Sequence, residues 1–260
     1  MIISFKSIHK LARAEIRKMS DRSLLTRDGI IQEDDLANLP DIVQKYMHRS
    51  QVIGKPWLHT IRLQQKGRIR MGPDKPWMDL AAEQHNFTDP PGFIWDARVK
   101  KGPLLSFSGR DKLFKGEGNM LIKVACFKVV DEKGEKIDQG SMIRYLSEMI
   151  WFPSALLGTY IQWEAISENA AKATLNLGNK AVCGKFIFND EGDMIDFQGQ
   201  RYMDTGKHAV LLPWHTPATG YGEMGGCRIP IKGSAVWTLK KGDFTYIDVE
   251  VTDIEYNPEI

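Results

Sequence analysis

The sequence predicts an α+β protein, in which a large, curved, mostly antiparallel sheet of the half-barrel kind wraps a central helix and follows an N-terminal helical appendage. Strand-like segments recur from residue 57 to the end of the chain, and short turns join most of them. Strands that are joined by short turns are antiparallel neighbours, and the strands do not alternate with helices as a doubly wound parallel sheet requires. The segment 141–152 is apolar on nearly every side, as expected for a helix that a sheet encloses.

Residues 1–19 predict a basic amphipathic helix. Apolar residues recur there at helical spacing, while cations occupy the other faces against a single acid, Glu15. In most globular proteins such a stripe packs on the rest of the domain, which is the interpretation we favour. Peripheral contact with an anionic membrane through residues 1–19 is the alternative. The apolar stripe consists of Phe5, Ile8, Ala12, Ile16 and Met19.

A second helix is predicted at 40–50, after a polar connector at 20–34. Pro40 suits its first turn, and the break at Gly54-Lys55-Pro56 then changes the period of the pattern. We therefore divide the chain into a helical appendage, 1–52, and a β-rich domain, 53–260, with the helix 141–152 embedded in it. The buried stripe of the second helix is Ile42, Val43, Tyr46 and Met47.

Alternation of apolar and polar residues predicts about ten or eleven strands, separated by turns rich in Gly, Pro and Asp. The segment 213–226 is expected to be a long loop with glycine hinges, either a lid over a site or a plain surface loop. The strand-like runs from which these strands are expected lie at 57–71, 77–87, 93–100, 104–108, 112–130, 160–167, 171–177, 181–189, 193–202, from about 208, 227–239 and 243–256.

Composition argues against several classes of function. The 260 residues are 42% hydrophobic and 26% charged, and the net charge of +2 does not fit a nucleic-acid binder. Cys126, Cys183 and Cys227 form no CxxC pair, so we expect neither a disulfide framework nor a zinc site, and isolated thiols favour a cytoplasmic location. No catalytic signature, metal-ligand spacing or membrane-spanning run occurs, so we expect no cofactor and no metal. Nothing in the sequence indicates an oligomeric state.

Arg144 and Glu148 are two charges in the otherwise apolar predicted helix. At i and i+4 they have the weaker order for an isolated helix, and they oppose its dipole. We therefore expect tertiary partners, with Asp111 and Arg201 favoured and Arg110 a further candidate. One interpretation is a buried charge network that fixes the helix to the sheet. The other is a site in which Arg144 or Arg201 holds an anionic group and Glu148 accepts a proton, which makes these three the candidate catalytic residues.

The chain has seven tryptophans, a high number for its length. Tryptophan often lines concave surfaces, and an aromatic cleft with a few converging polar groups is the usual form of a small-molecule site. Filling of the core is the alternative for most of them. The candidate ligand-binding residues are Trp95, Arg110, Asp111, Arg144, Glu148, Trp151, Arg201 and Trp214.

Several blocks of this sequence resemble an uncharacterised bacterial family that has a domain-of-unknown-function label. The matching blocks are Leu39–Met47, Pro91–Ala97, Gly109–Asp111, Arg144–Glu148, Trp151–Leu156 and Gly225–Pro230. The resemblance covers roughly residues 35 to 256 and implies no established activity, so it assigns no catalytic role. The order of elements is also similar, at the level of fold, to the half-barrels of bacterial lipoprotein carriers and of a class of cofactor-free pigment-biosynthesis enzymes.

The sequence leaves three functions open. The first is binding of an apolar or amphipathic small molecule, such as a lipid, in a cavity between sheet and helix. The second is a cofactor-independent enzyme that acts on a small acidic or aromatic substrate, with Arg144 and Arg201 orienting it and Glu148 moving a proton. The third is a structural or membrane-peripheral protein that acts through its basic N-terminal helix.

Overall fold

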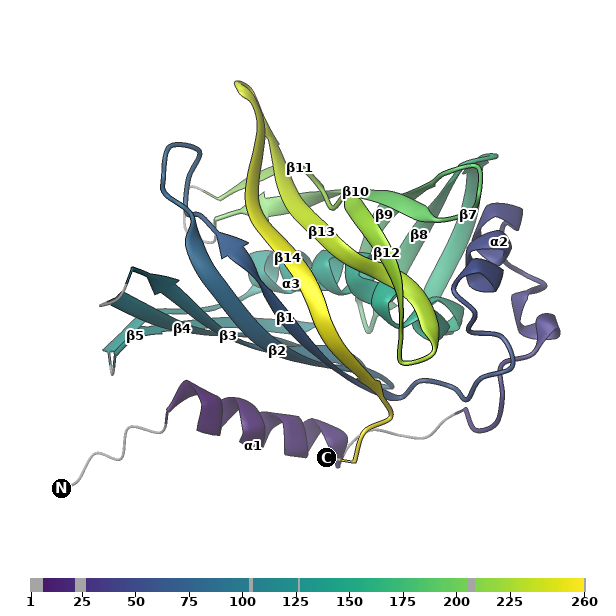
Figure 1. Cartoon of the computed structure of the whole chain (residues 1–260), viewed down its shortest axis with the longest axis horizontal. Helices are drawn as coiled ribbons and strands as arrows, with labels where there is room; N and C mark the ends of the chain where they lie inside the picture. Colours follow the sequence, from purple (N-terminus) through teal and green to yellow (C-terminus); the bar gives the residue numbers. More distant parts are fainter. Residues whose placement is uncertain (1–6, 22–26, 103–104, 126, 205–208, 260) are drawn as a thin grey trace.

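Figure 1 shows the computed structural model of the chain, in which one strongly curved sheet encloses a central helix. The structure describes residues 7–21, 27–102, 105–125, 127–204 and 209–259. The start of the first expected helix, part of the expected connector at 20–34, and the expected strand starts at 104 and 208 fall outside these ranges. Within the described residues, fourteen strands form a single antiparallel sheet. The prediction of an α+β fold with a curved antiparallel sheet around a helix is confirmed.

The elements have the following bounds. The helices are α1 (Ile8–Ser20), α2 (Asp41–Arg49) and α3 (Glu135–Glu148), and the short 3-10 segments are η1 (Glu33–Leu36), η2 (Met149–Trp151) and η3 (Pro153–Leu157). The strands are β1 (Thr60–Ile69), β2 (Met78–Thr88), β3 (Pro91–Lys101), β4 (Leu105–Phe114), β5 (Glu117–Val124), β6 (Phe127–Lys133), β7 (Ile161–Ser167), β8 (Ala170–Leu177), β9 (Lys180–Phe188), β10 (Met194–Met203), β11 (Val210–His215), β12 (Ala218–Met224), β13 (Cys227–Leu239) and β14 (Gly242–Tyr256).

The sheet consists of two arms that meet at its middle. β1 to β6 form a meander in one arm, while β14, β13, β11, β10, β9, β8 and β7 follow one another in the other arm, and β12 is paired to β13. β1 and β14 are hydrogen-bonded neighbours at the junction, where Leu63 lies opposite Ile254. The outer edges, β6 and β7, are at opposite ends of this order. The sheet is therefore an open half-barrel.

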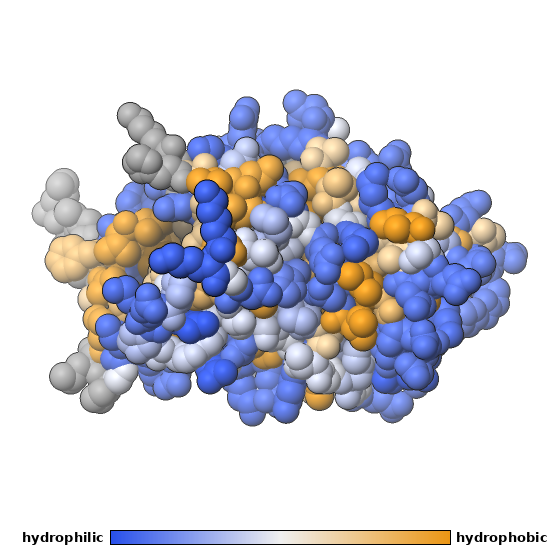
Figure 2. Space-filling model, turned by 90° about the horizontal axis from the view of Figure 1, so that it is seen from above, coloured by the Kyte–Doolittle hydropathy of each residue, from blue (hydrophilic) through white to orange (hydrophobic). Residues whose placement is uncertain are grey.

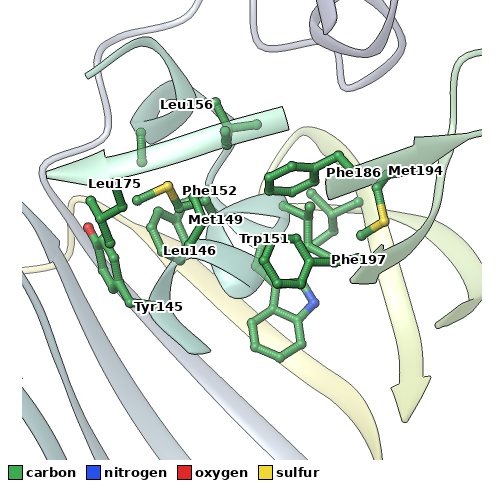
Figure 3. Packing of buried hydrophobic residues seen from close by; sticks show 14 of the residues in the cluster. Tyr145, Leu146, Met149, Trp151, Phe152, Leu156, Leu175, Phe186, Met194 and Phe197 are labelled. Atoms are coloured by element: carbon green, nitrogen blue, oxygen red, sulfur yellow. The ribbon is translucent and has the colours of Figure 1, made fainter. Parts of the chain in front are cut away.

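α3 lies on the concave side of the sheet, between the two arms (Figure 1). Its residues Ile143, Tyr145 and Leu146 are fully buried. Figure 3 shows Tyr145 and Leu146 among apolar side chains from the segment that follows the helix and from the second arm. Gly118 of β5 allows a close approach, because a Cβ there would lie only 2.7 Å from the carbonyl oxygen of Ile137. This packing accounts for a helix that is apolar on most sides.

The predicted bounds of the central helix, 141–152, are wrong at both ends. α3 begins at Glu135 and ends at Glu148, and 3-10 segments follow it. Its first turns are polar and contain Gly140, so they lack the apolar period on which the prediction depends. Gly134 precedes the helix with φ 109°, a conformation that glycine adopts readily, and it lets the chain reverse from β6 into α3.

The two N-terminal helices pack on different parts of the sheet. The apolar stripe of α1 is buried with Phe87 and Ile94 on the convex face, against β2, β3 and β4 (Figure 1). α2 packs near β8, and the hydroxyl of Tyr46 donates to the carbonyl oxygen of Ile150 at 3.0 Å. The expected buried stripes of both helices are confirmed, except for Phe5, which lies outside the described residues. The division of the chain at residue 52 stays a prediction.

Two further predictions, one of a strand and one of a loop, are wrong. The expected single run at 112–130 contains the end of β4, all of β5 and the start of β6. Lys115 and Ala125 adopt positive φ at the turns between them, which neither residue type signals in a sequence. The expected long loop at 213–226 instead contains the end of β11 and the whole of β12. Its glycines interrupt the apolar alternation that marks a strand.

Three further observations concern the described residues. None of their helices is long and apolar enough to cross a membrane. No group of three His, Cys, Asp or Glu side chains among them is placed to hold a metal ion. Cys183 is exposed and Cys227 is buried, both as free thiols, while Cys126 lies outside the described residues. The cytoplasmic location inferred from the thiols stays a prediction.

Candidate functional site

A cavity of about 640 Å³ occupies the concave side of the sheet, between α3 and both arms. Its walls come mainly from β1, β3, β4 and β5 on one side and from β10, β11, β13 and β14 on the other. Most of the lining is apolar, and Trp95, Trp151, Trp214 and Trp237 all contribute to it. The three tryptophans selected from the sequence therefore line one cavity, and Trp237 joins them.

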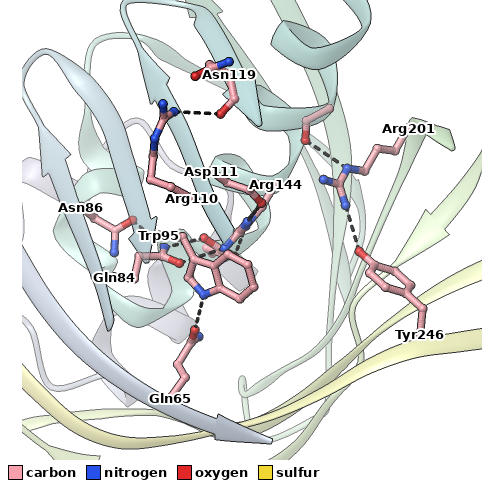
Figure 4. A network of polar contacts seen from close by, with 12 residues as sticks. Gln65, Gln84, Asn86, Trp95, Arg110, Asp111, Asn119, Arg144, Arg201 and Tyr246 are labelled. Atoms are coloured by element: carbon pink, nitrogen blue, oxygen red, sulfur yellow. Dashed lines mark hydrogen bonds and ion pairs between the residues drawn. The ribbon is translucent and has the colours of Figure 1, made fainter. Parts of the chain in front are cut away.

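Arg144 connects three elements at the wall of this cavity. Its Nε donates to Glu148 Oε1 at 2.7 Å within α3, and one terminal nitrogen donates to Asp111 Oδ2 of β4 at 2.9 Å. The other terminal nitrogen donates to Gln84 Oε1 of β2 at 3.0 Å. The Gln84 amide nitrogen donates in turn to Glu148 Oε2 at 2.7 Å and to Asn86 Oδ1 at 2.9 Å. Figure 4 shows Arg144, Asp111 and Gln84 of this network beside Trp95.

Aromatic rings complete the environment of the guanidinium. The Arg144 Cζ lies 4.8 Å from the ring centres of both Phe93 and Trp95, within cation–π range. Burial on its own lowers the pKa of Arg144, but the carboxylates of Glu148 and Asp111 outweigh it and raise that pKa above its ordinary value. Arg144 is therefore a permanent cation whose charge is compensated within the protein.

Glu148 is held by the same network. Each of its carboxylate oxygens accepts a hydrogen bond, one from Arg144 and one from Gln84, and its side chain is only 13% exposed. It lines the cavity, as Asp111 does. A general base needs an oxygen within hydrogen-bond reach of the proton that it takes. Each carboxylate oxygen accepts one of these hydrogen bonds and keeps a further lone pair, so the network fixes the position of Glu148 without using all of its acceptor sites.

Arg201 lies on another wall, apart from Arg144 (Figure 4). Its Nε donates to the carbonyl oxygen of Gly140 at 3.0 Å, and a terminal nitrogen donates to the Tyr246 hydroxyl at 2.9 Å. Its Cζ lies 4.9 Å from the ring centre of Trp214. Among the residues that the structure describes, these neutral groups are its partners, and no carboxylate is within ion-pair distance. The expected pairing of Arg201 with the charges of α3 is thus wrong, because Arg201 donates to a backbone carbonyl in the first half of that helix instead.

Arg110 does not join the other candidates. Its neighbour Asp111 faces the cavity, and successive strand residues face opposite sides of a sheet. On the convex side, Arg110 Nε lies 3.1 Å from Glu15 Oε2 of α1, and Lys112 Nζ lies 3.1 Å from the other oxygen of the same carboxylate. Arg110 therefore helps to hold α1 on the sheet.

Sequence reasoning missed four polar residues of the site. Gln65, Gln84 and Asn86 are buried in β1 and β2, and Tyr246 of β14 lies beside Arg201. Gln84 and Asn86 interrupt the apolar side of a strand that is buried at this end, which is the signal that the sequence offers. Tyr246 gives no such signal, because a tyrosine in a strand is ordinary.

Comparisons with known proteins give a family and a set of similar folds. Among solved structures, a DUF1329 family protein from Desulfovibrio piger has a TM-score of 0.49 and 7% identity, over 86% of this chain and 95% of that chain. A domain described as an outer membrane lipoprotein-sorting protein, from Vibrio parahaemolyticus, has a TM-score of 0.46 and 7% identity, over 85% of this chain and 92% of that chain. A LolA superfamily protein from Nitrosomonas europaea has a TM-score of 0.41 and 8% identity, over 84% and 93%.

These similarities concern the fold alone and say nothing about a ligand. Among curated proteins, none matches this chain. A family model matches residues 29–249, a stretch that includes every block of the resemblance noted in the sequence. The chain therefore belongs to the family of unknown function DUF6544.

Proposed function

We propose that this protein binds an amphipathic small molecule, such as a lipid, in the concave cavity. The observation that carries the proposal is the cavity itself, which has a volume of about 640 Å³ and a mostly apolar lining. Ligand pockets typically have about 300–1,000 Å³ and an apolar wall with a few polar groups. An apolar molecule of matching size gains free energy by leaving water for such a wall.

The two arginines of the cavity differ in a way that suggests how the ligand is oriented. Arg144 is already compensated by Asp111 and Glu148, whereas Arg201 has only neutral partners among the described residues. A partly buried cation without a counter-ion favours an anionic group nearby. We therefore place the acidic head of the ligand at Arg201 and its apolar body along the tryptophan-lined wall.

The enzymatic alternative has less support. It needs Glu148 to act as a proton acceptor, whereas the structure shows this carboxylate as a counter-ion of Arg144 that also accepts from Gln84. The membrane-peripheral alternative through residues 1–19 needs the apolar stripe of α1, and that stripe is buried on the sheet from Ile8 to Met19. The membrane-peripheral alternative thus requires the packing of α1 on the sheet to be broken first.

The test is to fill the cavity without disturbing the sheet. Gly109 lines the cavity, and a Cβ at this position would meet no atom within 4 Å. We expect the full-length wild-type protein to release a lipid on solvent extraction and to bind a fluorescent fatty acid, and we expect Gly109→Trp to lose both properties. Ser108→Trp is the matched control, because Ser108 is the adjacent residue on the opposite face of β4, and it should behave as wild type.

A second arm of the same experiment tests the orientation of the ligand. Arg201→Gln should weaken binding of the fatty acid by about tenfold or more, as expected for loss of a hydrogen bond to a charged group. Binding of the corresponding fatty alcohol should change little. If neither lipid binds the wild-type protein and no ligand is extracted from it, the proposed function is wrong.

A further inference from the structure

Most of the large apolar side chains that are exposed in the described part of the chain gather at one end of the molecule. Nine large apolar residues are exposed in the described part of the chain, and six of them lie at or near strand ends around the opening of the cavity. Figure 2 shows hydrophobic surface at this end of the molecule, at the left of the view. We call these six residues the mouth rim, and they are Met71, Leu105, Phe127, Val129, Val210 and Leu211.

Four residues of the mouth rim continue the wall of the cavity, whereas Leu211, opposite Tyr202, lies on the other face of β11. Met71 and Leu105 line the cavity and are exposed as well. Directly opposed residues of antiparallel strands share a face. By this rule Phe127, opposite Val124, extends the face of Phe107, which lines the cavity. In the other arm, Val210 at the start of β11 is exposed and lies opposite Met203, which also lines the cavity.

Cations accompany these apolar residues. Lys75 follows Met71 in the turn between β1 and β2, and Lys100 and Lys101 end β3 beside Leu105. All three lysines are exposed, and none forms an ion pair within the described part of the chain. The acid of the β1–β2 turn is Asp74. The turns next to Met71 and Leu105 therefore have a net positive charge.

We propose that the mouth rim docks on the surface of an anionic lipid bilayer. Apolar side chains up to 72% exposed, which lie on one turn and in the first residues of three strands and are accompanied by lysines, suit insertion between lipid headgroups. Lysines near an anionic leaflet add an attraction that depends on the lipid charge. Because the cavity opens at the same place, an amphipathic molecule could pass between bilayer and cavity without crossing water. The proposal goes beyond ligand binding and does not depend on which ligand the cavity holds.

The same end offers a better membrane contact than α1 does. The apolar stripe of α1 is covered by the sheet, so α1 presents only its polar face to the outside. The exposed cations Arg17 and Lys18 lie on that face. Variants at the mouth rim and in α1 therefore separate the two ways of meeting a membrane.

The experiment is flotation of the full-length protein with two kinds of vesicle, phosphatidylcholine alone and phosphatidylcholine mixed with phosphatidylglycerol. We expect the wild-type protein to float with the anionic vesicles and much less with the neutral ones. Met71→Ser/Phe127→Ser should weaken the anionic-vesicle binding by about tenfold or more, since two apolar side chains no longer insert. Lys75→Glu/Lys101→Glu should weaken it by a similar factor.

Two matched controls should keep wild-type binding. Ile166→Ser/Ile195→Ser removes exposed apolar residues away from the mouth rim, and Arg17→Glu/Lys18→Glu reverses the charge on α1. The proposal is overturned if the wild-type protein floats with neither vesicle, or floats equally with both. It is also overturned if only the α1 variant loses binding, or if the mouth-rim variants only convert an oligomer to a monomer.

Discussion

Arg144 joins α3 to β4 and β2 through Asp111 and Gln84, and to Glu148 of its own helix. Its side chain is 13% exposed, so its charge and those of its partners are largely removed from water. Arg144→Met should lower the free energy of unfolding by about 3 kcal/mol or more, because two carboxylates then stay in the cavity wall without a counter-ion. Denaturant titration of both proteins measures the difference.

Arg62 provides the control for this prediction. It also contacts three acids, Glu83, Asp253 and Glu255, but on the more exposed face of the sheet. Exposed ion pairs contribute less than about 1 kcal/mol, so Arg62→Met should have a small effect. If Arg144→Met and Arg62→Met lowered the free energy of unfolding equally, solvent exposure would not determine how much these ion pairs stabilise the fold.

His85 makes stability depend on pH. Burial, with a smaller contribution from the Arg62 cation, lowers the pKa of His85 to about 4, against about 6.5 in an unfolded chain. Glu83 lies 3.8 Å from the ring, but its carboxylate is 44% exposed and does not offset the burial. Between these two pKa values the unfolded chain binds a proton that the folded chain does not, so the folded state loses stability as pH falls through this range.

The expected size of this effect is up to about 3 kcal/mol between pH 6.5 and pH 4. His85→Gln should remove this part of the pH dependence, as measured by urea denaturation at several pH values. His48→Gln, at an exposed position, is the control and should follow the wild-type curve. If the stability of His85→Gln fell with pH as steeply as that of the wild-type protein, His85 would not be the cause of this pH dependence.

The charges of the site could be predicted in part from the sequence, and the amides could not. Arg144 and Glu148 oppose their own helix dipole, which indicates a tertiary partner, and Asp111 is that partner. Gln84 has no charge to balance, so nothing in the sequence says that its amide joins the two ends of an ion pair. Arg110 was also predicted to belong to the site, because sequence alone does not say which of two adjacent strand residues faces the cavity, and it lies on the opposite face.

At the scale of elements, α3 is fixed to both arms of the sheet by Asp138. One oxygen of this carboxylate accepts from the Gly118 backbone nitrogen of β5 at 2.7 Å, and the other pairs with Lys180 Nζ of β9 at 2.6 Å. Lys180 also donates to the carbonyl oxygen of Gly116 at 3.0 Å. A single side chain thus connects helix, first arm and second arm.

Asp138→Ala should therefore lower the free energy of unfolding by about 2–4 kcal/mol, because a buried backbone donor and a lysine lose their partner. Asp131→Ala is the matched control. Asp131 also pairs with a lysine, Lys128, at 2.9 Å, but the pair is exposed and should contribute less than about 1 kcal/mol. Hydrogen exchange at the Gly118 amide should accelerate in Asp138→Ala only, and an unchanged rate would count against the connection.

The limits of α3 show why elements are easier to predict than their ends. Residues 141–148 are apolar enough to mark a helix, whereas the turns that follow Glu135 depend on Gly134, which reverses the chain, and on Arg201, which bonds to Gly140. Both causes are tertiary or conformational, and neither produces an apolar period. α1 and α2 have clear stripes, and their buried residues follow the sequence closely.

At the scale of the molecule, short turns were sufficient to predict one curved antiparallel sheet. The sequence predicts too few strands for two reasons. Some turns contain no glycine, proline or other residue typical of turns, as at Ala125, and some strands are rich in glycine, as β12 is. The position of β14 next to β1 was not predictable, because it pairs the two ends of the β-rich chain and no local signal specifies such a partner.

The open edges of the sheet have a consequence for what the cavity can accept. Within the described residues, β6 and β7 are not paired to each other, so no closed ring of backbone hydrogen bonds fixes the diameter of the half-barrel. The arms are connected across α3 by side chains such as Asp138 and Lys180, which tolerate small shifts better than a ladder of strands does. We infer that the curvature of the sheet can adjust to the contents of the cavity. If the cavity binds lipids as proposed, mass spectrometry of the extracted ligand should find acyl chains of several lengths in one protein.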